Sequence, residues 1–261
     1  MTSLMLQEAM SAGDCVALQL TKDVERYAEL GRTLRSTSFH SAVTVARGSS
    51  DHASGYVAYL IMSRLGRLVT SLPMSLVTLY KSPLVTRDTL AISISQSGQS
   101  PDVVEPIQYF RDGGATTVAL VNDAESPLAQ SAAWTMPLHA GKEQSVAATK
   151  SFIASLVAGA RLVAEWQDDA ELKAGIAALP DALRAASQVD WSAAIEVLAP
   201  ARNIMVVGRG ISFPVALESS LKFKETSALQ AEAFSGAEIK HGPMALIEEG
   251  YPLLIFATRG P

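Results

Sequence analysis

The feature that most constrains the fold of this chain is a recurring unit of strand, loop and helix. "AVTVARGSSDHASGYVAYLIMSRL" and "TLAISISQSGQSPDVVEPIQYFRDGG" each begin with a β-branched apolar run, pass through a Gly/Ser-rich loop and continue in a helical pattern. "TTVALVND" and "AAWTMPLHAG" have the composition of two further strands, and "SVAATKSFIASLVAGARLVAEW" that of a long apolar helix. Strands that alternate with helices are typical of a parallel sheet covered on both faces. The sequence therefore predicts an α/β fold.

The strand–loop–helix pattern starts a second time near residue 203. "VARGSS" at Val45–Ser50 and "VGRGIS" at Val207–Ser212 share a strand end, Arg-Gly, a serine and a following helix. A repeat of this kind indicates two copies of one α/β unit. The second copy, 203–261, is less than half as long as the first, 39–166, so we expect it to be incomplete.

The flanking segments complete the predicted domain organisation. Residues 3–35 have apolar positions at helical spacing, and a polar, Ala-rich stretch from Gln167 to Trp191 is typical of a linking helix. We therefore predict three parts: an N-terminal helical segment (1–38), a first subdomain (39–185) and a truncated second subdomain (186–261).

Composition excludes several classes of function. The 261 residues are 48% hydrophobic and 18% charged, with a net charge of −5 and scattered basic residues, which disfavours binding to nucleic acid or an anionic membrane. The single cysteine, Cys15, predicts neither disulfides nor a thiolate metal site and favours a reducing cytoplasm. The start "MTSLMLQEAMSAGDC" lacks the pattern of a secretion signal, and no apolar run reaches membrane-spanning length. Histidine spacing predicts no metal site.

The loop "SQSGQSPD" (95–102) holds neutral hydrogen-bond donors at a predicted strand end. Ser100 is a plausible helix N-cap, and Pro101 suits the first helical position. Hydroxyls and backbone N–H groups at the positive end of a helix dipole suit an anion, most simply a phosphate. The alternative is that Ser and Gly are only turn formers. The equivalent loop "RGSS" (47–50), one unit earlier, favours the anion site.

A second dense stretch, "ALESSLKFKETSALQAEAFSGAEIKHGPMALIE", carries charged residues at helical spacing. Glu218, Lys222 and Glu225 share one helical face. An exposed ion-paired helix explains that pattern without any function. However, His241 stands before Gly-Pro among apolar residues, which is typical of a shaped loop rather than a solvated face.

Three stretches together, "SISQSGQSPD", "GKEQSVAATKSF" and "ALESSLKFKETSALQAEAFSGAEIKHGPMALI", resemble the sugar isomerase (SIS) domain family. The likeness covers essentially the whole chain. It is greatest to the isomerase half of glucosamine-6-phosphate synthase and to stand-alone glucosamine-6-phosphate deaminases of SIS type. It implies two flavodoxin-like α/β/α subdomains with parallel sheets, and a homodimer whose active site is shared between subunits.

The resemblance also implies which residues bind the substrate. The phosphate would be held by the hydroxyl and amide side chains of Ser95, Gln96, Ser97 and Ser100. The sugar would lie near Ser49 and Ser50. Val146 matches a family position that contacts the substrate through its backbone. A serine that often follows two residues later in the synthase is here Ala148.

For catalysis, the resemblance matches Lys222 and Glu225 to the catalytic pair and His241 to a histidine donated across the dimer. His241 would move a proton at the ring oxygen, and Glu225 would be the general base between carbons 1 and 2. Lys222 would keep Glu225 ionised or stabilise an enediol oxyanion. A family lysine near the far C-terminus has no counterpart. No cofactor is expected.

The resemblance implies conversion of glucosamine 6-phosphate and water to fructose 6-phosphate and ammonia. Glutamine-dependent synthesis is not expected, since residue 2 is Thr2 and Cys15 lies in a predicted helix. A related phosphosugar deaminase or an aldose–ketose isomerase stays open. So does a non-catalytic sugar-phosphate sensor, although a sensor needs only the phosphate loop and not Lys222, Glu225 and His241.

Overall fold

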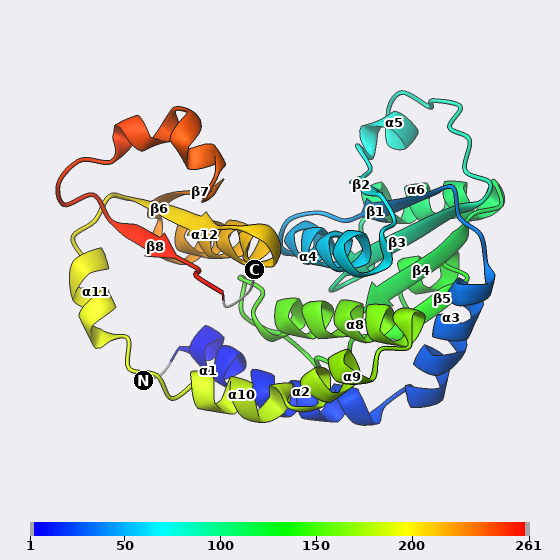
Figure 1. The fold of residues 1–261 in the computed structure, drawn as a ribbon, viewed down its shortest axis with the longest axis horizontal. Coiled ribbons are helices and arrows are strands. Elements are labelled where there is room, and N and C mark those ends of the chain that lie inside the picture. Colours follow the sequence, from blue (N-terminus) through cyan, green and yellow to red (C-terminus); the bar gives the residue numbers. More distant parts are fainter. Residues whose placement is uncertain (1–2, 259–261) are drawn as a thin grey trace. The chain divides into compact units, whose positions relative to one another are not determined.

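The computed structural model describes residues 3–258, which divide into two compact units (Figure 1). The first unit runs to Ser187 and the second begins at Gln188.

The first unit is built on a five-stranded parallel sheet. Its strands are β1 (Ser41–Val45), β2 (Val69–Ser71), β3 (Thr89–Ser95), β4 (Thr116–Val121) and β5 (Trp134–Pro137). They are ordered β2-β1-β3-β4-β5, and every pairing is parallel. This is the flavodoxin-like order, so the predicted α/β class and the implied fold are confirmed for this unit.

The sheet is buried on both faces, which is why its strands read as continuous apolar runs rather than as alternating ones. In β3, Leu90, Ile92 and Ile94 belong to a core shared with α4 and α8, whereas Ala91 belongs to the core on the opposite face. Successive side chains of a strand point to opposite faces. Both faces of β3 are therefore covered by apolar side chains, as a central parallel strand requires.

Ten helices of the first unit lie within the described residues. They are α1 (Leu4–Met10), α2 (Ala12–Thr21), α3 (Val24–Ser36), α4 (Ser49–Leu65), α5 (Ser75–Thr78), α6 (Pro101–Asp112), α7 (Pro127–Ser131), α8 (Lys150–Gln167), α9 (Ala170–Ala177) and α10 (Leu179–Ala186). Helices α3, α4 and α8 supply residues to the core on one face of the sheet, and α6 and α7 to the other (Figure 1).

The N-terminal helices pack directly on α8. Gly31 of α3 approaches α8 so closely that a Cβ atom there would lie 2.5 Å from the carbonyl oxygen of Glu165. The predicted linking helix of 167–191 is instead two short helices, α9 and α10. Proline is tolerated in the first turn of a helix but not in its interior, so a new helix begins at Leu179, just before Pro180. Helix α10 packs on α2, so it also belongs to the first unit.

The second unit repeats the start of the first. It contains α11 (Ser192–Leu198), β6 (Asn203–Gly208), η1 (Gly210–Ser212), α12 (Phe213–Ser227), β7 (Gln230–Ser235), η2 (Glu238–His241), η3 (Pro243–Leu246) and β8 (Leu253–Ile255). Its parallel strands are ordered β7-β6-β8. That order equals β2-β1-β3, so the internal repeat is confirmed. Within the described residues this sheet has three strands against five in the first unit.

No helix among residues 3–258 combines the length and the apolar character needed to cross a bilayer.

Candidate functional site

The strand order of the first unit creates a crevice at the carboxyl ends of β1 and β3. The chain leaves β1 towards β2 on one side and leaves β3 towards β4 on the other. The loops after these two neighbouring strands therefore diverge, and ligands of open α/β sheets bind at such a switch point. The two Ser/Gly loops singled out in the sequence are the ones that follow β1 and β3.

The loop after β3 has a rigid backbone. Gly98 has a φ angle of +63°, and a Cβ atom at this position would lie 2.1 Å from Ser126 Oγ. The Gly98 N–H donates to Ser95 Oγ at 2.9 Å, and the Gly98 carbonyl accepts from Leu128 N at 3.1 Å. The loop is therefore fixed both by its own serine and by the segment after β4.

Three of the predicted phosphate-binding residues, Gln96, Ser97 and Ser100, are exposed, and Ser95 is half-buried. Ser100 is the N-cap residue of α6 with Pro101 in the first turn, as predicted, but its side chain makes no capping hydrogen bond. Ser100 thus stands at the positive end of the α6 dipole, where an anion is favoured, and the exposed Gln96 and Ser97 precede it in the same loop.

Ser49 and Ser50 lie in the first turn of α4, at the end of β1. The N-cap residue of this helix is Gly48, whose φ of +55° favours glycine. The N–H of Ser50 donates to the carbonyl of Arg47 at 3.1 Å, which closes the turn that leads from β1 into α4. Both serines are half-buried and stand at the crevice between β1 and β3.

The loop that carries Val146 is held by a carboxylate that the sequence reasoning missed. Glu143 accepts hydrogen bonds from Thr149 N at 2.8 Å and from the hydroxyl of Ser151, so it caps the start of α8. The same carboxylate accepts from Gln96 Nε2 at 3.2 Å. Glu143 therefore connects the loop after β5 to the predicted phosphate loop. It lies within the motif "GKEQSVAATKSF", which could have indicated it.

A second carboxylate, Glu8 of α1, holds the other side of this loop. It accepts from Gln144 N at 2.6 Å and Ser145 N at 3.1 Å, and also from the Ser145 hydroxyl. These hydrogen bonds, that of the Ser145 hydroxyl above all, lower the pKa of Glu8. Val146 next to them has a fully exposed side chain, so its side chain contributes no packing to the first unit.

In the second unit, α12 aligns three charged side chains. Lys222 Nζ lies 3.2 Å from Glu218 Oε1 and 2.5 Å from Glu225 Oε2. The side chains are 6% exposed for Glu218, 17% for Lys222 and 35% for Glu225. The arrangement is therefore anchored at a buried carboxylate and opens to solvent at Glu225, unlike the fully exposed ion-paired face that was the alternative.

His241 ends the short helix η2 and is exposed. Gly242, which follows it, has a φ of +133°, and Pro243 then begins η3, so the histidine stands at a sharp turn. Its imidazole has no hydrogen-bond or ion-pair partner among residues 3–258. Within a single chain the structure thus brings Lys222 and Glu225 into contact, whereas no hydrogen bond or ion pair among the described residues joins His241 to either of them.

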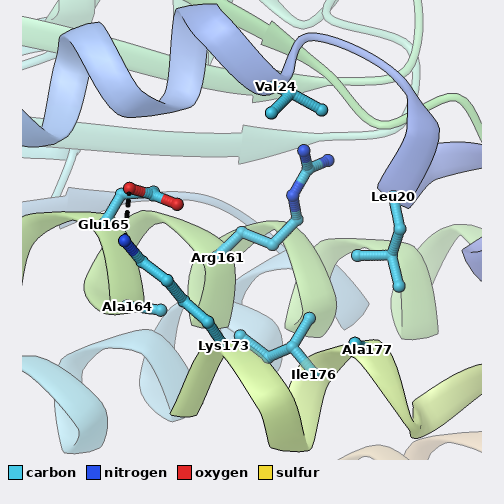
Figure 2. A pocket seen from close by; sticks show the side chains of 8 residues that line it. All are labelled: Leu20, Val24, Arg161, Ala164, Glu165, Lys173, Ile176 and Ala177. Atoms are coloured by element: carbon cyan, nitrogen blue, oxygen red, sulfur yellow. Dashed lines mark ion pairs between the residues drawn. The ribbon is translucent and has the colours of Figure 1, made fainter. Parts of the chain in front are cut away.

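A cavity of about 210 Å³ lies elsewhere in the first unit (Figure 2). It is lined by Leu20, Val24, Arg161, Ala164, Glu165, Lys173, Ile176 and Ala177. Figure 2 shows Lys173 directed to Glu165, with which it forms an ion pair of 2.9 Å. Arg161 donates to the carbonyl of Gln19 at 2.8 Å and lies 3.9 Å above the ring of Tyr27. The charged groups of Arg161, Glu165 and Lys173 thus hold α2, α3 and α9 against α8.

Across residues 3–258, no group of three or more His, Cys, Asp or Glu side chains is arranged to hold a metal ion.

Comparison with known proteins decides the family. The SIS domain family matches residues 37–164 and 197–261. The chain belongs to the SIS domain family. The first segment contains the five-stranded sheet and the predicted phosphate-binding residues. The second contains the three-stranded sheet together with Lys222, Glu225 and His241.

Individual relatives agree with this assignment. A glutamine–fructose-6-phosphate aminotransferase (isomerizing) of Zymomonas mobilis is 32% identical over 232 residues, 84% of this chain. The chain spans only 38% of that relative's length. A crystal structure from Silicibacter pomeroyi DSS-3, provisionally assigned as a phosphosugar isomerase, is 42% identical with a TM-score of 0.93; the match covers 98% of this chain and 78% of that one.

A further solved structure is the C-terminal domain of glucosamine-fructose-6-phosphate aminotransferase from Francisella tularensis. It is 25% identical with a TM-score of 0.80, and the match covers 98% of this chain and 76% of that chain. The SIS domain is therefore of the phosphosugar isomerase type.

Proposed function

We propose that this chain is an isomerising deaminase that converts glucosamine 6-phosphate and water to fructose 6-phosphate and ammonia. The observation that carries the proposal is the Lys222–Glu225 contact of 2.5 Å on α12, backed by the buried Glu218. An acid–base pair of this kind serves proton transfer between carbons, whereas a binding module has no use for it. The aminotransferase relative adds support, since its name includes an isomerizing step.

In the proposed mechanism the phosphate binds at the crevice of the first unit. Ser95, Gln96, Ser97 and Ser100 surround the positive end of α6, and this fixes the sugar without taking part in bond making. Ser49 and Ser50 at the start of α4 lie near the sugar. The backbone of Val146, on the loop held by Glu8 and Glu143, contacts the substrate.

Proton transfer follows ring opening, in which His241 moves a proton at the ring oxygen. Glu225 then removes the proton from carbon 2 of the open-chain aldehyde and returns it to carbon 1. The intermediate between these steps is an enolamine, and the product is an imine at carbon 2. Water adds to the imine and ammonia leaves, which gives the ketone of fructose 6-phosphate. Lys222 stabilises the oxyanion at carbon 1.

The proposal also includes a homodimer in the cytoplasm, in which His241 of one subunit completes the site of the other. The exposure of His241 supports this part, because an exposed histidine at a sharp turn can reach a second subunit.

A pure aldose–ketose isomerase is the second candidate, because the same base and phosphate site would serve a sugar without an amine. The test is to incubate the chain separately with glucosamine 6-phosphate and glucose 6-phosphate, and to measure ammonia and ketose phosphate. Ammonia and fructose 6-phosphate in equal amounts support the deaminase. Ketose from glucose 6-phosphate alone supports the isomerase. Tight binding of either sugar without turnover supports a sensor and contradicts both enzymes.

A further inference from the structure

We propose that Arg47 is an additional phosphate-binding residue of this site, and that it exchanges its contact with Asp102 for the phosphate of the ligand. This inference rests on the proposed function, because it concerns the same crevice. Arg47 would supply a cationic side chain to a phosphate loop that has none of its own, because the segment 93–102 contains no Lys, Arg or His.

The position of Arg47 follows from the sheet. Strands β1 and β3 are neighbours, with Val45 paired to Ser93, so the residues just after β1 face the loop just after β3 across the crevice. Arg47 is the second residue after the end of β1. Gly48, with its φ of +55°, then turns the chain into α4. A guanidinium on this turn can reach the start of α6.

The structure records that reach. Arg47 Nη2 lies 3.5 Å from Asp102 Oδ2, and Asp102 is the second residue of α6, directly after Pro101. The pair connects the turn after β1 to the first turn of α6, and its two residues are 55 apart in the sequence. The guanidinium therefore already stands beside the helix N-terminus at which the phosphate is proposed to bind.

The contact is weak enough to be exchanged. Its 3.5 Å separation is long for an ion pair, and the two side chains are 59% and 55% exposed. Exposed pairs of this kind contribute little to stability, because water and salt compete with them. A phosphate carries more charge than one carboxylate and accepts two parallel hydrogen bonds from a guanidinium. The phosphate is therefore the stronger partner for Arg47.

Asp102 then has a definite role. In the empty site it holds Arg47 across the crevice, and its charge is favourable at the N-terminus of α6. Once the phosphate arrives, the carboxylate competes with it for the same guanidinium. Removing Asp102 should therefore tighten phosphate binding, and only as long as Arg47 is present.

The experiment measures equilibrium binding of glucosamine 6-phosphate and of inorganic phosphate to the full chain by calorimetry at fixed pH and ionic strength. Arg47→Ala should weaken binding of both probes about tenfold or more, with Arg47→Lys in between, because lysine lacks the bidentate fork. Asp102→Asn should tighten binding, and this gain should vanish in the Arg47→Ala, Asp102→Asn double variant.

The chain offers a matched control on the same helix. Lys81 Nζ pairs with Glu105 Oε1 of α6 at 2.5 Å, and both side chains are exposed. Lys81→Ala and Glu105→Gln should change binding by less than about twofold, since their effect is limited to screened surface charge.

The outcomes separate this inference from the function on which it rests. If Ser97→Ala weakens phosphate binding and Arg47→Ala behaves like Lys81→Ala, the Arg47 inference is wrong and the phosphate site stands. If Asp102→Asn tightens binding equally with and without Arg47, the exchange is wrong. If the unaltered chain binds neither probe, or if neither Ser97→Ala nor Arg47→Ala alters binding, the phosphate site itself is wrong and the inference fails with it.

Discussion

Lys222 Nζ lies between two carboxylates of one helix, 2.5 Å from Glu225 Oε2 and 3.2 Å from Glu218 Oε1. The two carboxylates differ in exposure, 35% for Glu225 and 6% for Glu218. The exposed one is accessible to a substrate, and the buried one is not. This difference supports the proposal that Glu225 is the residue that transfers the proton and that Glu218 anchors Lys222.

This difference predicts unequal effects on stability. Glu218→Ala should lower the free energy of unfolding by about 3 kcal/mol, because it removes one partner of a buried charged pair. Glu225→Ala should cost less than about 1 kcal/mol, since its contact with Lys222 is partly exposed to water. Urea denaturation of both variants against the unaltered chain measures the two values. Equal losses would contradict the assignment of Glu218 as the anchor.

The phosphate loop depends on the absence of a side chain at Gly98. Gly98→Ala should destabilise the chain by about 2–4 kcal/mol, since a Cβ atom would meet Ser126 Oγ and the left-handed backbone is itself unfavourable for alanine. Gly114 is the matched control, because it also has a positive φ but has open space around its Cβ position. Gly114→Ala should cost only about 1 kcal/mol.

Thermal or urea unfolding of both variants tests this. Phosphate competition against glucosamine 6-phosphate should also weaken in Gly98→Ala and not in Gly114→Ala. A Gly98 variant as stable as the Gly114 variant would show that the loop adapts to a side chain.

The Glu8 carboxylate makes the stability of the chain depend on pH. Its pKa is lower in the folded chain than its ordinary value of 4.5, because the Ser145 hydroxyl and the Gln144 N–H donate to the ionised form. A lowered folded-state pKa contributes stability above the unfolded-state pKa and loses it as the pH falls through the folded-state value.

The difference in unfolding free energy between the unaltered chain and Glu8→Gln should therefore be full at neutral pH and shrink below pH 4.5. Chemical denaturation at several pH values measures it, with Glu25→Gln, at an exposed position of α3, as a control. A difference that stays constant from pH 7 to pH 3 would show that the Glu8 hydrogen bonds do not favour the ionised form.

Much of the fold could be predicted because it is local. The β-branched runs and helical spacing predicted β1, β3, β4, β5 and α8 in order, and "VARGSS" against "VGRGIS" indicated the repeat of β1 and β6. The carboxyl ends of parallel strands lie at one edge, so the Ser/Gly loops could be placed together before their geometry was known.

What could not be predicted are contacts between distant residues. Glu8 bonds to Gln144 and Ser145, and Arg47 reaches Asp102, although no spacing in the sequence relates them. The prediction of one linking helix was wrong in part, because Pro180 stands in the first turn of α10 and separates this helix from α9. A sequence pattern indicates which face of a helix or strand is apolar. Which residues of two distant segments come into contact depends on how the helices and strands pack.

The most direct test of the central claim compares the unaltered chain with Glu225→Gln on glucosamine 6-phosphate, with turnover and equilibrium binding measured on the same preparations. Ammonia and fructose 6-phosphate in equal amounts are expected from the unaltered chain. Glu225→Gln should lose turnover by roughly 10²–10⁴-fold, as expected for removal of a general base. Substrate affinity should stay within about twofold, because the base acts in the transition state. A comparable loss of binding in Glu225→Gln, or unchanged turnover, would contradict the assignment of Glu225 as the base.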